Sequence, residues 1–313
     1  MSARDPQLAL TQKAHRHAKW LALWQSRGAL ARLLYPLSWL FEKVVRVRRT
    51  AFMRHWRAQY RMPIPVVVVG GIMVGGVGKT PIVAALVQDL REVGFHPVVI
   101  SRGYGGANAA NHRMEATRVT EDSLASEVGD EPLQLALNTG VPVWVGQDRV
   151  AVARAVCVAH PECDVIVCDD GLQHMALRRD LEICIFNDQG IGNGFLLPAG
   201  PLREPWPRPV DMVLHAGSAP PRGTSAPAFV LQRSLAPYAL QSDGHHVPLA
   251  QLQGQPLHAV AAVARPAEFF AMLRTQGLTL EHTEALPDHY DFYSWQRISD
   301  QRLRLVCTEK DAV

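Results

Sequence analysis

The segment VVVVGGIMVGGVGKTP, residues 66–81, joins an apolar run to a glycine-rich turn that ends in a Lys-Thr pair. The four valines predict a buried strand, and the residues after Gly78 have the apolar spacing of a helix. A strand, a glycine-rich turn and a helix that begins at Lys-Thr form a P-loop, in which backbone N–H groups and a helix N-terminus face an anion. The residue types and their order therefore predict a site for the phosphates of a nucleotide.

The P-loop pattern assigns chemical roles to single residues of this segment. Lys79 is expected to contact the β and γ phosphates, and the Thr80 hydroxyl is expected to bind Mg²⁺. The residues predicted to surround the phosphates are Gly75, Gly76, Val77, Gly78, Lys79 and Thr80. The strict pattern also has a glycine five residues before Gly78, where this chain has Met73. A glycine-rich turn that binds no ligand therefore stays open as an alternative.

Two adjacent carboxylates follow a second apolar run, in the segment DVIVCDDGLQH at residues 164–174. Asp169 and Asp170 stand at the end of the predicted strand, where P-loop enzymes place the carboxylate that holds Mg²⁺ directly or through water. The carboxyl ends of parallel strands form the crevice in which α/β sheets bind ligands. A polar turn in which both aspartates only cap the backbone is the alternative, but the P-loop upstream favours a metal site.

Candidates for acid–base chemistry lie in the segments GDEP and PDHYDF. Asp130 and Glu131 precede Pro132, and an aspartate before a proline-started helix is an ordinary N-cap. The functional interpretation makes Asp130 a general base for an attacking hydroxyl. Far along the chain stand Asp288 and His289. A lone histidine is more often structural, but His289 is also suited to orienting or tuning a carboxylate base.

Two further segments carry polar side chains that suit substrate contacts. SRGYGG supplies Arg102 and Tyr104 after a predicted strand, candidates for contacts with an anion and a sugar. GNGFLLPAGPLREP, residues 192–205, has neither helical nor strand periodicity and contains Arg203 and Glu204. Irregular loops beside an α/β sheet are usually binding elements.

The elements that position these residues alternate along the chain from residue 64. Strands are expected at 64–71, 96–103, 141–146, 163–171, 181–188 and 210–217. Helices are expected at 80–95, 130–140 and 148–161. Continuously apolar strands separated by helices predict an α/β fold of the P-loop NTPase type, with a mostly parallel sheet covered on both faces.

A change in composition marks a boundary near residue 217. GSAPPRGTSAPA, residues 217–228, is rich in proline, glycine and serine and predicts a linker or long loop. Beyond it, strands at 229–235 and 258–264 and a helix near 266–277 indicate a second, smaller α/β unit. We therefore expect an N-terminal segment at 1–62, a P-loop core at 63–217 and a second domain at 218–313. Because the chain stops shortly after a strand, we expect this second domain to be incomplete at its C-terminus.

The net charge of +3 conceals a strong asymmetry. Residues 1–62 contain thirteen Lys and Arg against two acidic residues, a balance of +11, so the remaining chain carries −8. A basic N-terminus on an acidic body predicts an anionic partner for that end, either lipid headgroups or nucleic acid. The five cysteines form no C-x-x-C pair, so the sequence indicates neither a zinc ribbon nor a disulfide framework, and free thiols suit a reducing cytosol.

The same N-terminal segment is rich in aromatic residues, with four of the seven tryptophans. Its most apolar part, ALARLLYPLSWLFEKVV, is interrupted by Arg32, Pro36, Glu42 and Lys43, so it is too broken for a comfortable spanning helix. No small-residue cleavage site of a secretory signal follows it. Tryptophan, leucine and flanking arginines are typical of an amphipathic helix in a membrane interface. A spanning helix and a helix pair packed on the protein stay open as alternatives.

Together, these motifs resemble the tetraacyldisaccharide 4′-kinase, or lipid A 4′-kinase, family. The matching segments, in the order of the family, are VGGVGKTP, SRGYGG, GDEP, CDDGLQH, NGFLLPAGPLREP, ARP, DHYDF and TEKDAV. They extend from about residue 20 to the last residue. The P-loop of this family usually lacks the first glycine too, so Met73 resembles a family variant. Family members usually continue past TEKDAV, and this chain does not.

The resemblance implies ATP- and Mg²⁺-dependent phosphorylation of the 4′-hydroxyl of a tetraacyldisaccharide 1-phosphate, a lipid A precursor. It implies a peripheral or interfacial enzyme on the cytoplasmic face of the inner membrane, with two α/β/α units and the site between them. Asp130 matches the proposed base and His289 its partner, and Asp170 is the expected Walker-B carboxylate of the acidic pair. The expected substrate contacts are Arg102, Tyr104, Glu131, Gln173, His174 and Arg203.

Two rival functions compete with this interpretation. A membrane-associated P-loop ATPase switch of the partitioning or targeting type would bind a protein partner, but it usually has a second lysine early in the loop, where this chain has Met73 and Val74. A nucleic-acid-binding arm is less favoured, since the arm is rich in Trp and Leu and no nucleic-acid fold motif accompanies it. We therefore expect an acylated disaccharide substrate and a lipid surface as partners, with no nucleic acid and no obligate protein partner.

Overall fold

The structure is a computed structural model, and it describes residues 20, 23–76, 78–103, 116–288, 290, 292, 295–300 and 302–312. The chain divides into two compact units, Met1–Leu231 and Gln232–Val313. Each unit has its own hydrophobic core.

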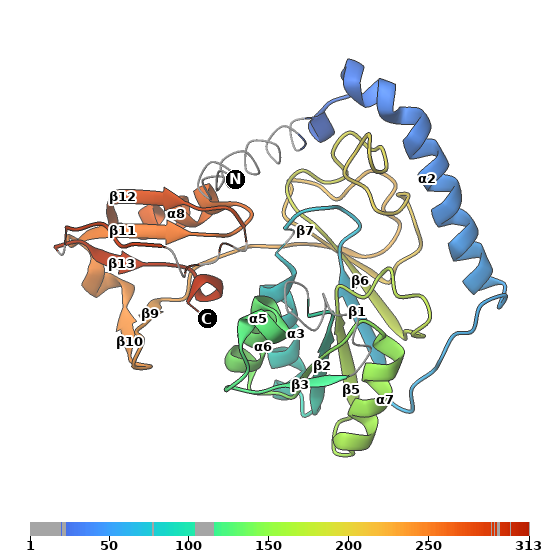
Figure 1. Ribbon diagram of the computed structural model, residues 1–313, viewed down its shortest axis with the longest axis horizontal. Helices are drawn as coiled ribbons and strands as arrows, with labels where there is room; N and C mark the ends of the chain where they lie inside the picture. Colours follow the sequence, from blue (N-terminus) through green and yellow to red (C-terminus); the bar gives the residue numbers. More distant parts are fainter. Residues whose placement is uncertain are drawn as a thin grey trace, which may run out of the picture. The chain divides into compact units, whose positions relative to one another are not determined.

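An eight-stranded sheet forms the centre of the first unit (Figure 1). Its strands are β1 (Val66–Gly70), β2 (Pro97–Ser101), β3 (Thr117–Val119), β4 (Val143–Val145), β5 (Val165–Asp169), β6 (Leu181–Phe186), β7 (Met212–His215) and β8 (Ala228–Val230). They lie in the order β3-β4-β2-β5-β1-β6-β7-β8. All neighbours pair in parallel except β3, which is antiparallel to β4. The predicted α/β fold with a mostly parallel sheet is therefore confirmed.

Helices cover both faces of this sheet, which explains why its strands are apolar at consecutive positions. These helices are α3 (Lys79–Glu92), α5 (Ala125–Val128), α6 (Asp130–Thr139) and α7 (Arg149–Ala159). The crossover through α3 connects β1 to β2 and so moves toward the β3 side of the sheet. The crossover through α7 connects β4 to β5 and so moves toward the β8 side. Since such crossovers are right-handed, α3 and α7 lie on opposite faces, as Figure 1 shows. Every residue of β2 and β5 is consequently buried.

The N-terminal segment contains the 25-residue helix α2 (Ala29–Met53). Ser38 attaches it to the core, because its hydroxyl donates to the Leu196 carbonyl at 2.7 Å and accepts from the Ala199 N–H at 2.9 Å. The outer face has an apolar stripe at spacings of three and four residues, with exposed fractions of 54–74%. We call this set the α2 stripe, and it consists of Leu30, Leu33, Leu37, Leu40, Val44 and Val47. Among the described residues, no helix is long and apolar enough to cross a membrane.

One expected strand belongs to a different part of the fold. We predicted a strand at 229–235 in the second domain, but β8 pairs in parallel with β7 and closes the large sheet. The loop at 217–227 is long enough to return the chain along β7, so it is an internal connection of the first unit. That unit accordingly runs to Leu231.

The second unit is a small α/β structure. Its elements are β9 (Tyr238–Leu240), β10 (His246–Pro248), β11 (Pro256–Ala261), α8 (Pro266–Thr275), β12 (Thr279–Ala285) and β13 (Arg304–Val306), with short 3₁₀ helices at Leu249–Leu252 and Glu309–Asp311. β9 and β10 form a hairpin, and β11 lies between β12 and β13 in a three-stranded parallel sheet. Apolar residues of β11 and α8 make up most of its core. The strand and helix that we expected at 258–264 and 266–277 are thus present as β11 and α8.

The start of α7 provides a test of the local folding argument. Asp148 is the N-cap, and its Oδ1 accepts hydrogen bonds from Val150 N at 2.9 Å and Ala151 N at 3.3 Å. We expect Asp148→Ala to lower the free energy of unfolding by about 1 kcal/mol, because two helix N–H groups lose their acceptor. Asp148→Asn retains an acceptor oxygen and serves as the matched control. Chemical denaturation of both variants checks this, and equal losses in the two variants would contradict a capping role.

Candidate active site

The glycine-rich turn after β1 begins later than the strict P-loop pattern places it. Met73 is almost fully buried and forms a bridge with Leu202, and Val74 N donates to the Pro201 carbonyl at 2.8 Å. Position 73 therefore lies in bridged backbone beside Leu202, where the methionine side chain fills space in the core that a glycine would leave empty. The turn itself starts at Gly75, whose φ of 107° is accessible mainly to glycine. This explains physically why the chain has methionine at position 73.

The helix after the turn presents its N-terminus at the end of β1. α3 begins at Lys79, and its N-cap Gly78 has left-handed backbone and provides no capping side chain. The first N–H groups of such a helix are suited to binding an anion. Lys79 Nζ lies 3.7 Å from Asp170 Oδ1, which brings the P-loop lysine to the predicted acidic pair.

The two aspartates of that pair point in different directions. Asp169, the last residue of β5, is 1% exposed, and its Oδ2 accepts a hydrogen bond from Ser101 Oγ at 3.1 Å. Its Oδ1 is buried and has no hydrogen-bond partner in the part of the chain that the structure describes. Burial raises the pKa of Asp169 to about 6, and the charges of Glu131 and Asp170 act in the same direction. This carboxylate oxygen is thus available to a cation.

Asp170 is held between two cations. Its backbone has a φ of 47°, a conformation that is uncommon for residues other than glycine but is tolerated best by Asp and Asn. Arg203 donates to both carboxylate oxygens, at 3.1 and 3.3 Å, and to the Gly71 carbonyl at 2.8 Å. Burial alone would raise the pKa of Asp170, but Lys79 and Arg203 outweigh it and the pKa lies below its usual value. Lys79, Asp170 and Arg203 therefore form one charged cluster.

Gln173 and Glu204 form a second polar pair beside this cluster. Gln173 Nε2 donates to Glu204 Oε1 at 2.8 Å and contacts the Gly71 carbonyl at 3.4 Å. Arg203 N donates to the Ile72 carbonyl at 2.6 Å, which attaches the irregular loop at 192–205 to the backbone after β1. The structure thus brings three segments that we predicted from sequence to one edge of the sheet.

Of the other predicted residues of the first unit, the structure describes His174, Glu131 and Asp130 near the same acidic pair. Burial, together with the charges of Arg149 and Arg102, lowers the pKa of His174 to about 4, so this imidazole is neutral at pH 7. Glu131 acts electrostatically on Asp169, which places the start of α6 near the acidic pair. Asp130 is the first residue of α6, follows the N-cap Gly129, and accepts a hydrogen bond from Glu131 N at 3.0 Å.

Three predicted site residues, Val77, Tyr104 and His289, lie outside the described residues. Their roles stay predictions, as does the pairing of His289 with Asp130. Asp288 belongs to the second unit, where it accepts a hydrogen bond from Lys310 Nζ at 2.8 Å.

Sequence reasoning missed Arg149, which is 1% exposed at the start of α7. Its Nη1 donates to the Gly146 carbonyl, while Nε and Nη2 have no hydrogen-bond partner among the described residues. Its charge lowers the pKa of both Asp170 and His174. The sequence signal was a single arginine shortly after the β4 segment, which we interpreted only as part of the first turn of the helix expected at 148–161. A buried guanidinium with unused donors is suited to an anionic ligand.

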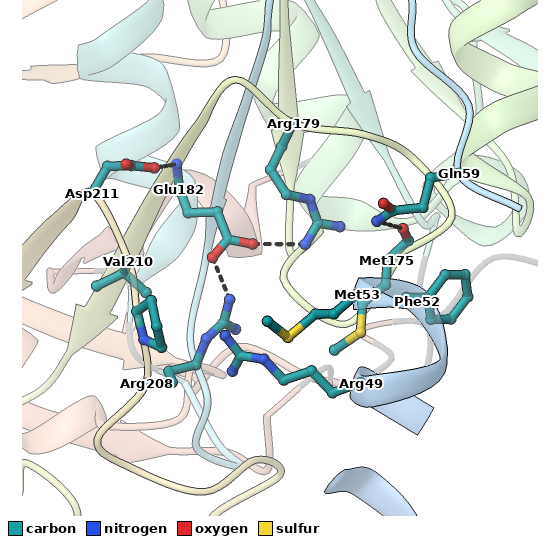
Figure 2. A pocket seen from close by; sticks show the side chains of 11 residues that line it. Arg49, Phe52, Met53, Gln59, Met175, Arg179, Glu182, Arg208, Val210 and Asp211 are labelled. Atoms are coloured by element: carbon teal, nitrogen blue, oxygen red, sulfur yellow. Dashed lines mark hydrogen bonds and ion pairs between the residues drawn. The ribbon is translucent and has the colours of Figure 1, made fainter. Parts of the chain in front are cut away.

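A separate cavity of about 310 Å³ lies at the C-terminal end of α2. None of the described P-loop residues lines it. Figure 2 shows Arg179 and Arg208 directed at Glu182, with Arg49 of α2 beside Arg208. Arg179 Nη1 lies 2.7 Å from Glu182 Oε1, and Arg208 forms a close ion pair with the same carboxylate. Burial and the charge of Arg208 lower the pKa of Arg49.

This cavity is connected to the charged cluster through polar contacts. Arg208 Nη1 donates to Glu204 Oε2 at 3.0 Å, and Glu204 accepts from Gln173. Arg48 of α2 donates to the Gln173 carbonyl at 3.2 Å. The end of α2 is therefore joined by hydrogen bonds to the segment that carries the acidic pair.

Comparisons with known proteins identify the family of this chain. The family model described as Tetraacyldisaccharide-1-P 4′-kinase matches residues 30–313. A tetraacyldisaccharide 4′-kinase of Verminephrobacter eiseniae (strain EF01-2) is 58% identical over 296 residues, covering 93% of this chain and 67% of that protein. One from Acidovorax sp. (strain JS42) is 57% identical over 290 residues, covering 93% and 84%.

A solved structure supports the same assignment. The crystal structure of LpxK from Aquifex aeolicus in complex with ATP has a TM-score of 0.76 and 28% sequence identity, covering 90% of this chain and 89% of that one. The resemblance found in the motifs is therefore confirmed over almost the whole chain. The chain belongs to the tetraacyldisaccharide 4′-kinase family, the ATP-dependent kinases of lipid A biosynthesis.

Proposed function

We propose that the charged cluster at the carboxyl ends of β1 and β5 is the phosphoryl-transfer centre of this kinase. The observation that carries the proposal is the convergence of Lys79, Asp170 and Arg203 beside Asp169, whose Oδ1 has no hydrogen-bond partner within the described part of the chain. Phosphoryl transfer depends mainly on positioning and on neutralising phosphate charge. Two cations and the N-terminus of α3 meet that requirement for the γ-phosphate of ATP.

The donor set at this edge fits Mg²⁺. Asp169 and Asp170 supply carboxylate oxygens, and Thr80 supplies a hydroxyl on the first turn of α3. Oxygen ligands of this kind are those that Mg²⁺ prefers. The buried Asp169 Oδ1, which has no hydrogen-bond partner among the described residues, is the ligand that the structure favours most. When bound, the ion would neutralise the charge that develops on the phosphates.

The acceptor is the 4′-hydroxyl of a tetraacyldisaccharide 1-phosphate. A sugar hydroxyl has a high pKa, so a carboxylate that accepts its proton assists the attack. Asp130 is only half-buried at the start of α6 and suits this role. His289 is assigned to orient or tune Asp130. Arg102, Tyr104, Glu131, Gln173 and His174 are candidates for contacts with the disaccharide and its phosphate.

The α2 stripe supports association with a lipid surface, which would bring the enzyme to its acylated substrate. Six apolar residues lie exposed along one side of α2, and basic residues stand between and after them. Such a helix inserts its apolar face among acyl chains while its cations attract anionic headgroups. The surface would be the cytoplasmic face of the inner membrane. Spacings of three and four also suit a helix pair between two copies, which the experiment on α2 must distinguish.

Lys79→Ala tests the charged cluster. We expect kcat to fall by more than about 100-fold, because the lysine neutralises phosphate charge that shifts during transfer. Transfer of labelled phosphate from ATP to a lipid A precursor gives the rate, and thermal unfolding shows whether the variant folds. A folded variant whose turnover stays within about threefold of the parent chain would remove Lys79 from the centre.

Asp130 and His289 test the proposed base. Asp130→Ala should lose about 10² to 10⁴ in rate while still binding ATP. His289→Ala should lose less, and the double variant should resemble Asp130→Ala, because residues that act as a unit have non-additive effects. If Asp130 serves only the helix, Asp130→Ala should instead lose about 0.5–2 kcal/mol of stability with kcat nearly intact. Fully multiplicative rate losses in the double variant would argue against a coupled pair.

Leu33→Asn with Leu40→Asn tests the α2 stripe. We expect binding to vesicles with anionic lipids to weaken at least about tenfold, because burial of each leucine contributes about 1.5–3 kcal/mol. Val158→Asn on α7 changes an even more exposed apolar residue outside the α2 stripe and is the control. High salt should release only part of the parent chain, since apolar insertion is not screened. Complete release by salt, or a stripe variant that changes only the oligomeric state, would contradict an interfacial helix.

A further inference from the structure

Three side chains with metal-binding atoms meet on one face of the sheet in the second unit. His258 lies on β11, and His282 and Glu284 lie on β12. His258 is in register with His282 across the parallel pair. His282 and Glu284 are two residues apart, so both side chains stand on the same face of their strand. The pairing of β11 with β12 thus assembles a His-His-Glu set from distant segments.

The three groups lie within reach of a single ion. The rings of His258 and His282 are 4.7 Å apart between centroids, and His258 Nε2 lies 3.5 Å from Glu284 Oε2. One ligand atom from each residue lies within 4.8 Å of the others. Bonds from Zn²⁺ to nitrogen or oxygen are about 2.0–2.2 Å long, so the ligand atoms of one ion are at most about 4.4 Å apart. A small rotation of the exposed His282 ring would close the remaining difference.

His258 is the observation that points to a ligand. Its side chain is fully buried, yet neither ring nitrogen makes a well-formed hydrogen bond among the described residues, and Nε2 has only the 3.5 Å contact with Glu284. Burying a polar group without a partner costs free energy, so an unsatisfied buried imidazole requires an explanation such as a bound ion. Burial, and then the charge of His282, lowers the pKa of His258, which favours the neutral imidazole that metals bind.

The surroundings also resemble the second layer of a metal site. Trp295 Nε1 donates a hydrogen bond to Glu284 Oε2 at 3.2 Å, and the Trp295 ring lies 6.2 Å from that of His258. Carboxylate ligands of metals are commonly held by hydrogen bonds of this kind. Glu284 is partly accessible and His282 is exposed, which leaves a path by which an ion can enter.

We propose that His258, His282 and Glu284 bind a divalent transition metal ion, with Zn²⁺ as the best match. Two imidazole nitrogens and one carboxylate suit Zn²⁺, whereas Mg²⁺ prefers a shell made entirely of oxygen. A bound ion would join β11 to β12 and stabilise the folded second unit. All three ligands belong to Gln232–Val313, while the acidic pair belongs to Met1–Leu231, so this is a site separate from the one that would hold Mg²⁺.

A second group in the first unit, His160, Glu162 and Cys163, must be separated from it experimentally. It is the weaker candidate, because burial raises the pKa of Cys163 to about 11 and so disfavours the thiolate that binds metal. Glu162 already contacts His160 Nδ1 at 3.0 Å. Cys163→Ser therefore serves as the variant that removes this alternative.

The test is a Zn²⁺ titration of the full chain after treatment with a chelator, with excess Mg²⁺ present to occupy oxygen sites. We expect the parent chain to bind Zn²⁺ at this site and His282→Ala and Glu284→Gln to weaken that binding at least about tenfold. His245→Ala, an exposed histidine of the same unit, and Cys163→Ser should leave it unchanged. Thermal unfolding should show that Zn²⁺ raises the Tm of the parent chain but not that of His282→Ala.

Three outcomes would overturn the proposal. The first is equal Zn²⁺ binding by the parent chain and by both ligand variants. The second is loss of binding in Cys163→Ser, which would assign the ion to the other cluster. The third is a Co²⁺-loaded parent chain whose visible absorption matches that of His282→Ala. Because His282 is exposed, its replacement should not unfold the chain, and Glu284→Gln provides an independent ligand change.

Discussion

The parallel pairing of β1 with β5 is the constraint on which the rest of the site depends. Val69 is in register with Asp169, so the acidic pair emerges beside the backbone that leads from β1 into the P-loop. Both strands lie at the centre of the sheet, and β5 is buried throughout. A slip of one residue would turn Asp169 to the opposite face of the sheet. The position of the carboxylates relative to Lys79 is thus fixed by the core.

Charge burial at this edge determines which ligands the site can accept. Asp170 is compensated by Lys79 and Arg203, whereas Asp169 retains an oxygen without a partner among the described residues. A buried ionised carboxylate is costly unless a positive charge is near, and the raised pKa of Asp169 reflects that cost. A cation beside Asp169 would favour its ionised form. In this lipid A 4′-kinase, a bound cation would therefore supply the positive charge that stabilises ionised Asp169.

Local sequence patterns predicted those parts of the fold whose signal is local. The P-loop, the acidic pair after β5 and the helices α3, α6 and α7 each have their pattern within one short segment. β8 could not be assigned to its sheet, because its partner β7 is chosen by packing and not by sequence spacing. Arg149 was missed for a related reason: nothing in a linear pattern shows that a helix-starting arginine faces the interior. The His258–His282 contact likewise depends on the register between two strands.

The attachment of α2 has a consequence for orientation. A helix of 25 residues is about 37 Å long, and this one is joined to the core near its middle by Ser38 and near its end by Arg48. Two attachment points along one axis prevent the helix from turning independently of the sheet. Any surface that received the α2 stripe would therefore also set the tilt of the sheet, and with it the direction in which the carboxyl ends of β1 and β5 point. An enzyme bound in this way could still turn about the normal of the surface, but it could no longer tilt about the two axes that lie in the surface.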